Sequence, residues 1–277
     1  AGINNTRNGA AQSISSRQIQ ELPSINHSVA DIARINPFVK VSEGGAMSIA
    51  GSNNRYNAIQ IDGAMSNDVF GLTANGSNGG QAGTQPFSME TIEQLQVSIA
   101  PFDVRQSGFS GGAINAITKS GTNDFHGSVY TYFQNGDLVG DKYQKHDKSG
   151  DSEDYGKMTD YTIGATLGGP IVKDKLFFFA NFERTSKEYD NAFSADNGMS
   201  KVDFTIANDI LDVVKNRAAQ YGVTYRGTLG TPKEYTYSDK VGLKLDWNIN
   251  DRNHASLRWS FVDAKQNNNT TTASNLR

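Results

Sequence analysis

The chain has 277 residues and a formal net charge of −3, with a pI of about 5.8, so it offers no basic surface for nucleic acid. Its mean hydropathy is −0.53, and no run approaches the ~18 apolar residues that a spanning helix needs. These values exclude a helical membrane protein, and the absence of cysteine excludes disulfide frameworks and thiolate metal sites. Because the chain starts at Ala1 without a methionine and stops in the polar run 267–272, we expect both ends to be internal to a longer protein.

The N-terminal part is predicted to hold short, mixed elements. Ser15 or Ser16 caps a helix that Pro23 stops, and Asn26 or Ser28 caps a second helix over 28–35. One or two helical turns capped by Ser88 are predicted over 88–94. Strands are predicted at 38–42, 46–50, 57–63, 95–99 and 113–118, with a long Gly/Asn-rich loop over 66–85. Residues 1–123 therefore favour a small α+β domain.

From residue 124 the hydrophobic period becomes two. In 240–249, Val241, Leu243 and Leu245 alternate with Lys240, Gly242 and Lys244, which places an apolar face opposite a polar one. Similar segments are 125–133, 160–168, 175–188 and 252–263. We expect strands of about 10 residues, the length of a tilted membrane strand.

The connections between these segments alternate in length. Residues 169–174 and 250–251 are short turns, whereas 136–159 and 189–235 are long and polar, the second with a predicted helix over 203–220. Short turns on one side and long loops on the other are typical of an outer-membrane β-barrel. A soluble β-sandwich would also have alternating strands, so it stays as a weaker alternative.

The ordered succession of these segments resembles the TonB-dependent outer-membrane receptor family over nearly the whole chain. The plug domain of that family is similar to the segments 15–23 (SSRQIQELP), 54–57, 61–63 (IDG), 93–97 and 110–123 (SGGAINAITKSGTN). Phe125-His126-Gly127 resembles the opening of its first barrel strand. Residues 168–171 and 175–179 are similar to the Oar-like branch of the family.

The resemblance implies a plug domain over 1–123, followed by the first five strands of a 22-stranded antiparallel transmembrane barrel over 124–277. It implies an active transporter of the bacterial outer membrane that binds an unidentified ligand outside and opens by plug movement. Its partners would be a periplasmic TonB-type energy-transducing protein and outer-membrane lipid. No cofactor, metal or enzyme activity is expected. Ala50 stands where many siderophore-type plugs carry Arg, so the resemblance does not point to an iron chelate.

Five strands alone would leave unpaired edges in lipid. Either the remainder of the barrel is another chain, or this stretch does not insert by itself. A different class of function, surface adhesion or assembly with the barrel as an anchor, would suit the long loop 189–235.

Two sets of candidate site residues follow. Loop residues expected to contact ligand are Asn67, Asp68, Phe70 and Gln85; the alternative is that they pack the loop onto the barrel wall. Charged residues expected to pair between plug and wall are Arg55, Arg105, Glu183, Lys240, Lys244, Asp246 and Arg258; the alternative is that they line water-filled gaps.

Other chemistry is less well supported. The Gly-rich stretch 76–83 lacks the GK[ST] ending of a phosphate loop, and the histidines at 27, 126, 146 and 254 have no zinc-ligand spacing. The acidic residues at 147, 151, 153 and 154 do not match an EF-hand and indicate a solvated loop.

Overall fold

The computed structural model describes residues 10–22, 24, 28–42, 45–68, 70, 73, 76–99, 111–139, 142–144, 152–154, 158–190, 204–225, 227 and 233–267. These residues form two compact units. The first draws on Ala1–Tyr130, Ile163–Arg184 and Ser238–Ala264, and the second on Thr131–Thr162, Thr185–Tyr237 and Lys265–Arg277. The long C-terminal strands run through both.

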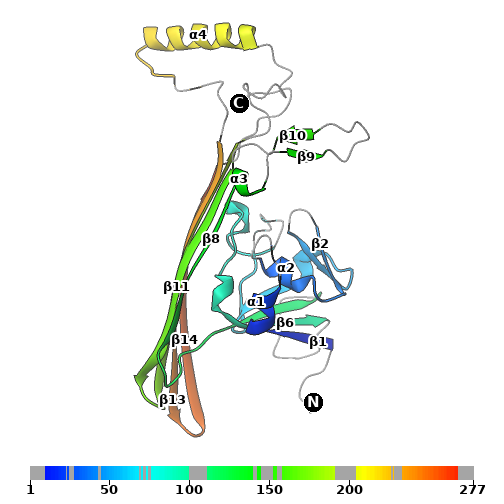
Figure 1. Ribbon diagram of the computed structural model, residues 1–277, viewed down its shortest axis with the longest axis vertical. Helices are drawn as coiled ribbons and strands as arrows, with labels where there is room; N and C mark the ends of the chain where they lie inside the picture. The colour runs from blue at the N-terminus through cyan, green and yellow to red at the C-terminus, as the bar shows by residue number, and fades with distance from the viewer. Residues whose placement is uncertain are drawn as a thin grey trace. The chain divides into compact units, whose positions relative to one another are not determined.

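The N-terminal domain is built on a five-stranded sheet in the order β1-β6-β7-β4-β5 (Figure 1). The strands are β1 (Ala10–Ser15), β4 (Ala58–Ile61), β5 (Ala64–Met65), β6 (Ile92–Ile99) and β7 (Ala113–Thr118). β6 pairs antiparallel with both β1 and β7, whereas β4 and β7 pair in parallel. A separate antiparallel pair is formed by β2 (Val39–Val41) and β3 (Met47–Ile49).

Short helices flank this sheet. α1 (Ser16–Glu21) begins with a capping box, in which Gln18 N–H donates to Ser15 Oγ at 3.4 Å and Ser15 N–H donates to Gln18 Oε1 at 3.0 Å. α2 (Val29–Ala33) is capped by Ser28, whose Oγ accepts from Asp31 N–H at 3.1 Å. The three-residue 3-10 helices are η1 (Asn54–Tyr56), η2 (Gly80–Ala82) and η3 (Met89–Thr91).

Apolar side chains from these elements form one core. Ile49, Leu95, Val97 and Ala33 are fully buried, and they cluster with residues of β4, β7 and α2. One of these four side chains therefore comes from a helix and three come from the strands β3 and β6, which lie far apart in the chain. Burial of apolar area thus holds the domain together.

The C-terminal half forms a second five-stranded sheet in the order β14-β13-β12-β11-β8, with the strands side by side in chain order (Figure 1). Its strands are β8 (His126–Asn135), β11 (Met158–Val172), β12 (Leu176–Asp190), β13 (Lys233–Asn250) and β14 (Asn253–Gln266). Cross-strand contacts such as Ser128–Thr166, Thr162–Thr185 and Arg184–Asp239 fit antiparallel neighbours.

One face of this C-terminal sheet is apolar and exposed, and the other is polar. Leu243, Trp247 and Ile249 of β13 are 40–51% exposed, whereas Ser238 and Lys240 are buried. The same alternation separates exposed Ile163 and Leu167 of β11 from buried Thr166. We call these the apolar face and the polar face of the C-terminal sheet.

The connections at one end of the sheet are turns, at 173–175 and 251–252. At the other end the chain forms α3 (Gly136–Val139), the pair β9 (Lys142–Gln144) and β10 (Ser152–Asp154), and the helix α4 (Phe204–Gln220). α4 exposes Ile206, Ile210 and Val213. Among the helices of the described residues, none combines the length and apolarity needed to cross a membrane.

The structure confirms the predicted fold class and corrects three details. The expected strand length of about 10 residues is wrong for four of the five strands, which have 14 to 18 residues, because polar segments continue the ladders beyond the apolar stretch. β6 begins at Ile92 rather than at residue 95. The helical turn after Ser88 is only η3, and the Ser88 side chain does not cap it.

Candidate functional site

The polar face of the C-terminal sheet carries side chains that bind the N-terminal domain. Residues of β12 and β13 that alternate with the exposed apolar ones, among them Glu183 and Lys240, are buried there. Thr84 of the N-terminal domain donates through Oγ1 to Ser238 Oγ at 3.0 Å. Because successive side chains of a strand point to opposite faces, every second residue of β12 and β13 reaches the interface with the N-terminal domain.

The Glu183 carboxylate lies at the centre of a buried group of four side chains, the Glu183 cluster (Ser88, Tyr130, Glu183, Lys240). Glu183 Oε1 accepts from Lys240 Nζ at 2.7 Å. Glu183 Oε2 accepts from Ser88 Oγ at 2.5 Å and from Tyr130 Oη at 2.9 Å. The Lys240 and Glu183 side chains are only 7% and 9% exposed, so both charges depend on these partners.

Two local features bring the hydroxyl groups to Glu183. Ser88 precedes η3 and turns its side chain away from the helix, while Thr91 Oγ1 donates to the Ser88 carbonyl at 2.6 Å. Tyr130 lies across Gly164 of β11, where an added Cβ would approach Tyr130 Cε2 to 2.8 Å. A glycine at 164 is therefore needed for the phenol to reach the carboxylate.

A second group, the Asp62 cluster, consists of Asp62, Thr118, Lys244 and Arg258. Lys244 Nζ lies 3.6 Å from Asp62 Oδ1, and Arg258 Nε lies 3.6 Å from Asp62 Oδ2. Lys244 Nζ also donates to the Thr118 carbonyl at 3.1 Å. The three charged side chains are 11–22% exposed, so water screens them only in part.

Asp62 owes its position to the turn between β4 and β5. Asp62 and Gly63 both have positive φ, 50° and 82°, which fits the type I′ turn favoured in two-residue hairpins. The carboxylate is fixed by Thr118, whose N–H donates to Oδ1 at 2.8 Å and whose Oγ1 donates to Oδ2 at 2.6 Å. The turn thus points the Asp62 carboxylate toward the C-terminal sheet, and Thr118 of β7 fixes that carboxylate in place.

The connection from β7 to β8 is clamped to the turn between β11 and β12. Asn123 Nδ2 donates to Asp174 Oδ1 at 2.6 Å, and Asp174 N–H donates to Asn123 Oδ1 at 2.8 Å. At Gly121, an added Cβ would lie 2.7 Å from the Gly169 carbonyl oxygen and 3.0 Å from Phe177 Cβ. This close approach leaves no room for a side chain.

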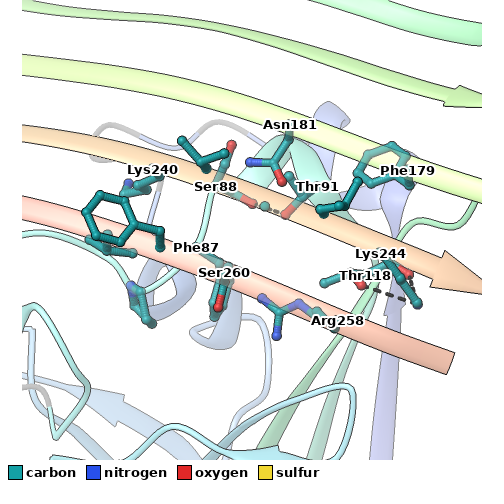
Figure 2. A pocket seen from close by; sticks show the side chains of 16 residues that line it. Phe87, Ser88, Thr91, Thr118, Phe179, Asn181, Lys240, Lys244, Arg258 and Ser260 are labelled. Atoms are coloured by element: carbon teal, nitrogen blue, oxygen red, sulfur yellow. Dashed lines mark hydrogen bonds between the residues drawn. The ribbon is translucent and has the colours of Figure 1, made fainter.

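A small cavity lies beside both clusters (Figure 2). Figure 2 shows Ser88 and Thr118 of the N-terminal domain among its lining residues, with Lys240, Lys244 and Arg258 contributed by the C-terminal sheet. Its volume of about 20 Å³ suffices for a water molecule, far below the ~300 Å³ of a small-molecule site. It is an interface gap in this state.

The four predicted ligand contacts differ in how their side chains are used. Asn67 Oδ1 accepts from Ile59 N–H at 2.7 Å, and Gln85 Oε1 accepts from Val29 N–H at 3.5 Å. The Asp68 carboxylate accepts from the N–H groups of Phe70 and Thr73. The Phe70 side chain, by contrast, is 84% exposed.

The predicted charged set is also divided. Glu183, Lys240, Lys244 and Arg258 contact the N-terminal domain or each other as described, whereas Arg55 is exposed. Asp246 is on the polar face, and its Oδ2 is buried without a hydrogen-bond partner among the described residues. Arg105 lies outside the described residues. In the described part of the chain, no group of His, Cys, Asp or Glu side chains could hold a metal ion.

Sequence reasoning missed several members of the two clusters. Asp62 is predicted only as part of the 61–63 motif and Ser88 only as a helix cap, and no role is predicted for Tyr130 or Thr118. Asp62-Gly63 is a turn signal whose first residue is charged, and that charge was the available clue. Nothing local distinguishes Ser88 or Tyr130, because their partners lie 95 and 53 residues away.

Comparison with known sequences places the chain among outer-membrane proteins. A family model described as an outer membrane beta barrel domain matches residues 117–229. The TonB-dependent transporter Oar of Myxococcus xanthus is 33% identical over 175 residues, which cover 59% of this chain and 16% of Oar. The probable TonB-dependent siderophore receptor PirA of Acinetobacter baumannii is 25% identical over 191 residues, covering 63% of this chain and 23% of PirA. The chain thus spans less than a quarter of either relative.

Solved structures share the fold at low sequence identity. The outer membrane transporter YddB of Escherichia coli superposes with a TM-score of 0.66 at 16% identity, covering 94% of this chain and 34% of YddB. A ferric enterobactin receptor of Pseudomonas aeruginosa, in complex with enterobactin, gives a TM-score of 0.61 at 15% identity, with coverage of 94% and 34%. Nearly all of this chain therefore corresponds to about one third of each of these two proteins.

Proposed function

Since this chain is an outer-membrane β-barrel homologue of the TonB-dependent transporters, we propose that it forms the plug domain (1–123) and first barrel strands (124–277) of an active transporter. The observation that carries the proposal is the pair of polar clusters. A domain held against a barrel wall by hydrogen bonds and ion pairs can separate from it without exposing a large apolar surface.

Transport would follow from movement of the plug. Ligand binds on the outer side, and binding favours engagement of a periplasmic TonB-type protein, which pulls the plug from the Glu183 and Asp62 clusters and opens a path. The two open edges of the C-terminal sheet, β8 and β14, would pair with the remaining strands of the barrel, because lipid cannot satisfy backbone groups.

Among the predicted ligand contacts, we propose that Phe70 touches the ligand directly, because its side chain is exposed. Asn67, Asp68 and Gln85 would shape the loop instead, since backbone N–H groups already bind their side chains.

Depletion of nutrients from the medium tests the function. The full-length protein, expressed in strains with and without a working TonB system, is expected to remove at least one compound only when both are present, as followed by mass spectrometry. Phe70→Ala should reduce the rate about tenfold or more, as expected when an aromatic side chain that the bound ligand covers is lost. Phe38→Ala, which removes another exposed phenylalanine (58%), should not. Equal depletion in all strains would refute transport.

Adhesion remains a second candidate because α4, in the long connection between β12 and β13, exposes Ile206, Ile210 and Val213. Exposed apolar residues on one helix suit contact with another macromolecule. Attachment of cells to surfaces that is lost on deletion of 204–220, but is independent of TonB and of Phe70, would support this function instead.

A further inference from the structure

Two cations stand directly opposite each other on the polar face of the C-terminal sheet. Across β13 and β14, Asn248 Oδ1 lies 2.8 Å from His254 Nδ1. Further along the same two strands, Tyr235 N–H donates to Asn267 Oδ1 at 2.7 Å. Both pairs fit one antiparallel register of β13 and β14, which places Lys244 opposite Arg258. Like charges in directly opposite positions destabilise a sheet, so an anion between them stabilises this pair.

Asp62 is that anion. Among the carboxylates of the described residues, it alone lies within 4 Å of either cation, with one oxygen near each. Asp246 is on the same face two residues from Lys244, yet its Oδ2 makes no hydrogen bond to any described residue. The two cations and the Asp62 carboxylate sum to +1, and to +2 without Asp62.

The anion and the cations belong to different parts of the protein. Asp62 is bound by Thr118 N–H and Oγ1, so it would move with the N-terminal sheet. Lys240, by contrast, is paired with Glu183 of the same C-terminal sheet, and would keep its partner. Separation of the two sheets would therefore uncover Lys244 and Arg258 alone.

We propose that Lys244 and Arg258 form an anion-binding subsite on the barrel wall, occupied in this state by the Asp62 carboxylate as a tethered ligand. When the plug moves, the subsite takes a carboxylate or phosphate group of the transported molecule. The passage of that molecule rests on the function proposed above, whereas the subsite itself does not. Arg258 supplies the planar donor fork that suits such oxyanions, and Lys244 adds a point charge.

Replacement of the tethered ligand by a free anion tests the subsite. In Asp62→Asn the turn keeps a residue that tolerates positive φ, but the charge is lost. Inorganic phosphate, titrated at constant ionic strength into the purified full-length variant, is expected to raise Tm by about 2–4 °C more than in the wild type. Asp124→Asn, an exposed carboxylate changed in the same way, gives the general effect of phosphate on the protein.

Neutralising a cation is the decisive control. The extra phosphate shift of Asp62→Asn should disappear in Asp62→Asn/Arg258→Gln. A shift in Asp62→Asn no larger than in Asp124→Asn, or one that survives the loss of Arg258, would overturn the subsite. If the Asn variant does not fold, Asp62→Gly removes the carboxylate without strain at positive φ and gives the same readout. Phosphate binding in a protein without TonB-dependent uptake would sink the transport function and leave the subsite intact.

Discussion

At the scale of single residues, the interface relies on buried charge. Lys240 and Glu183 are less than 10% exposed, and breaking such a pair leaves an uncompensated charge away from water. Arg184 and Asp239, which are the chain neighbours of Glu183 and Lys240, form a bidentate pair that is far more exposed. A salt bridge on the buried polar face of the C-terminal sheet therefore affects the stability of the protein more than one on the exposed face.

We expect Lys240→Met to lower the free energy of unfolding by about 3–5 kcal/mol, because Glu183 is left buried and charged. The double variant Glu183→Gln/Lys240→Met should recover most of this loss. Calorimetry of the full-length protein measures both, with Arg17→Met in an exposed helix pair (86% and 63% exposed) as a control expected to cost less than about 1 kcal/mol. A double variant as unstable as Lys240→Met would show that the unpaired Glu183 charge does not cause the loss.

Gly164 is expected to matter only because Tyr130 lies over it. Gly164→Ala places a Cβ against the phenol ring and should cost about 1–3 kcal/mol, as overpacking does. In a Tyr130→Ala background the same change should cost close to nothing. Thermal unfolding of the four proteins completes the cycle, and additive effects would mean that the contact is not the cause.

At the scale of elements, each long strand combines an apolar stretch, which matches the thickness of the hydrocarbon, with a polar stretch that continues the ladder of hydrogen bonds beyond it. In β13, Tyr237 and Trp247 are on the exposed apolar face. Ten residues at about 3.4 Å each, tilted by about 40°, correspond to about 26 Å along the membrane normal. That distance matches the ~25 Å apolar band between aromatic girdles, so we expect the rest of β13 to extend beyond the hydrocarbon.

This geometry predicts a depth dependence. Leu243→Arg puts a charge between the two aromatic positions and should cost about 2–4 kcal/mol in folding into lipid vesicles. Ile249→Arg, on the same face but beyond Trp247, should cost about 0–1 kcal/mol. Heat-modifiable mobility of the full-length protein on gels reports folding, and the reverse order would place the apolar band elsewhere on the strand.

At the scale of the whole molecule, the N-terminal domain has two kinds of attachment to the C-terminal sheet. The connection after β7 is clamped by the reciprocal Asn123–Asp174 hydrogen bonds and by tight packing at Gly121. The Ser88, Asp62 and Thr84 contacts join surfaces that are far apart in the chain. We infer that the first attachment is a fixed anchor and that the second releases.

Disulfide bonds separate these two roles. The 277 residues contain no cysteine, so Thr84→Cys/Ser238→Cys and Asn123→Cys/Asp174→Cys each add one pair. Under oxidising conditions the Thr84→Cys/Ser238→Cys disulfide should lower the rate of uptake more than about tenfold, because it holds the N-terminal domain to β13. Reduction of the disulfide should restore the rate. The second should leave uptake unchanged. Blocked uptake with the second pair would mean that the anchor also releases.

The strand alternation could be predicted from sequence because it is local. The face on which Val241, Leu243 or Lys244 lies can be predicted from the residues two positions away. The turn at Asp62-Gly63 and the helix cap at Ser15 each depend on a segment of about four residues. The barrel strands followed from such features, and the outer-membrane location followed from the family resemblance that the order of motifs carries. The lengths of the strands did not, because ladder hydrogen bonds also extend polar segments.

By itself, the sequence determined which side chains of the C-terminal half turn toward apolar surroundings, since period-two patterning is a property of neighbouring residues. Only the tertiary structure decided which polar groups meet. The Ser88 side chain binds Glu183 instead of capping a helix as predicted. Asp62, in a turn, pairs with Lys244 and Arg258, which follow it by 182 and 196 residues. Such pairs depend on burial and distance between segments far apart in the chain, for which no local pattern exists.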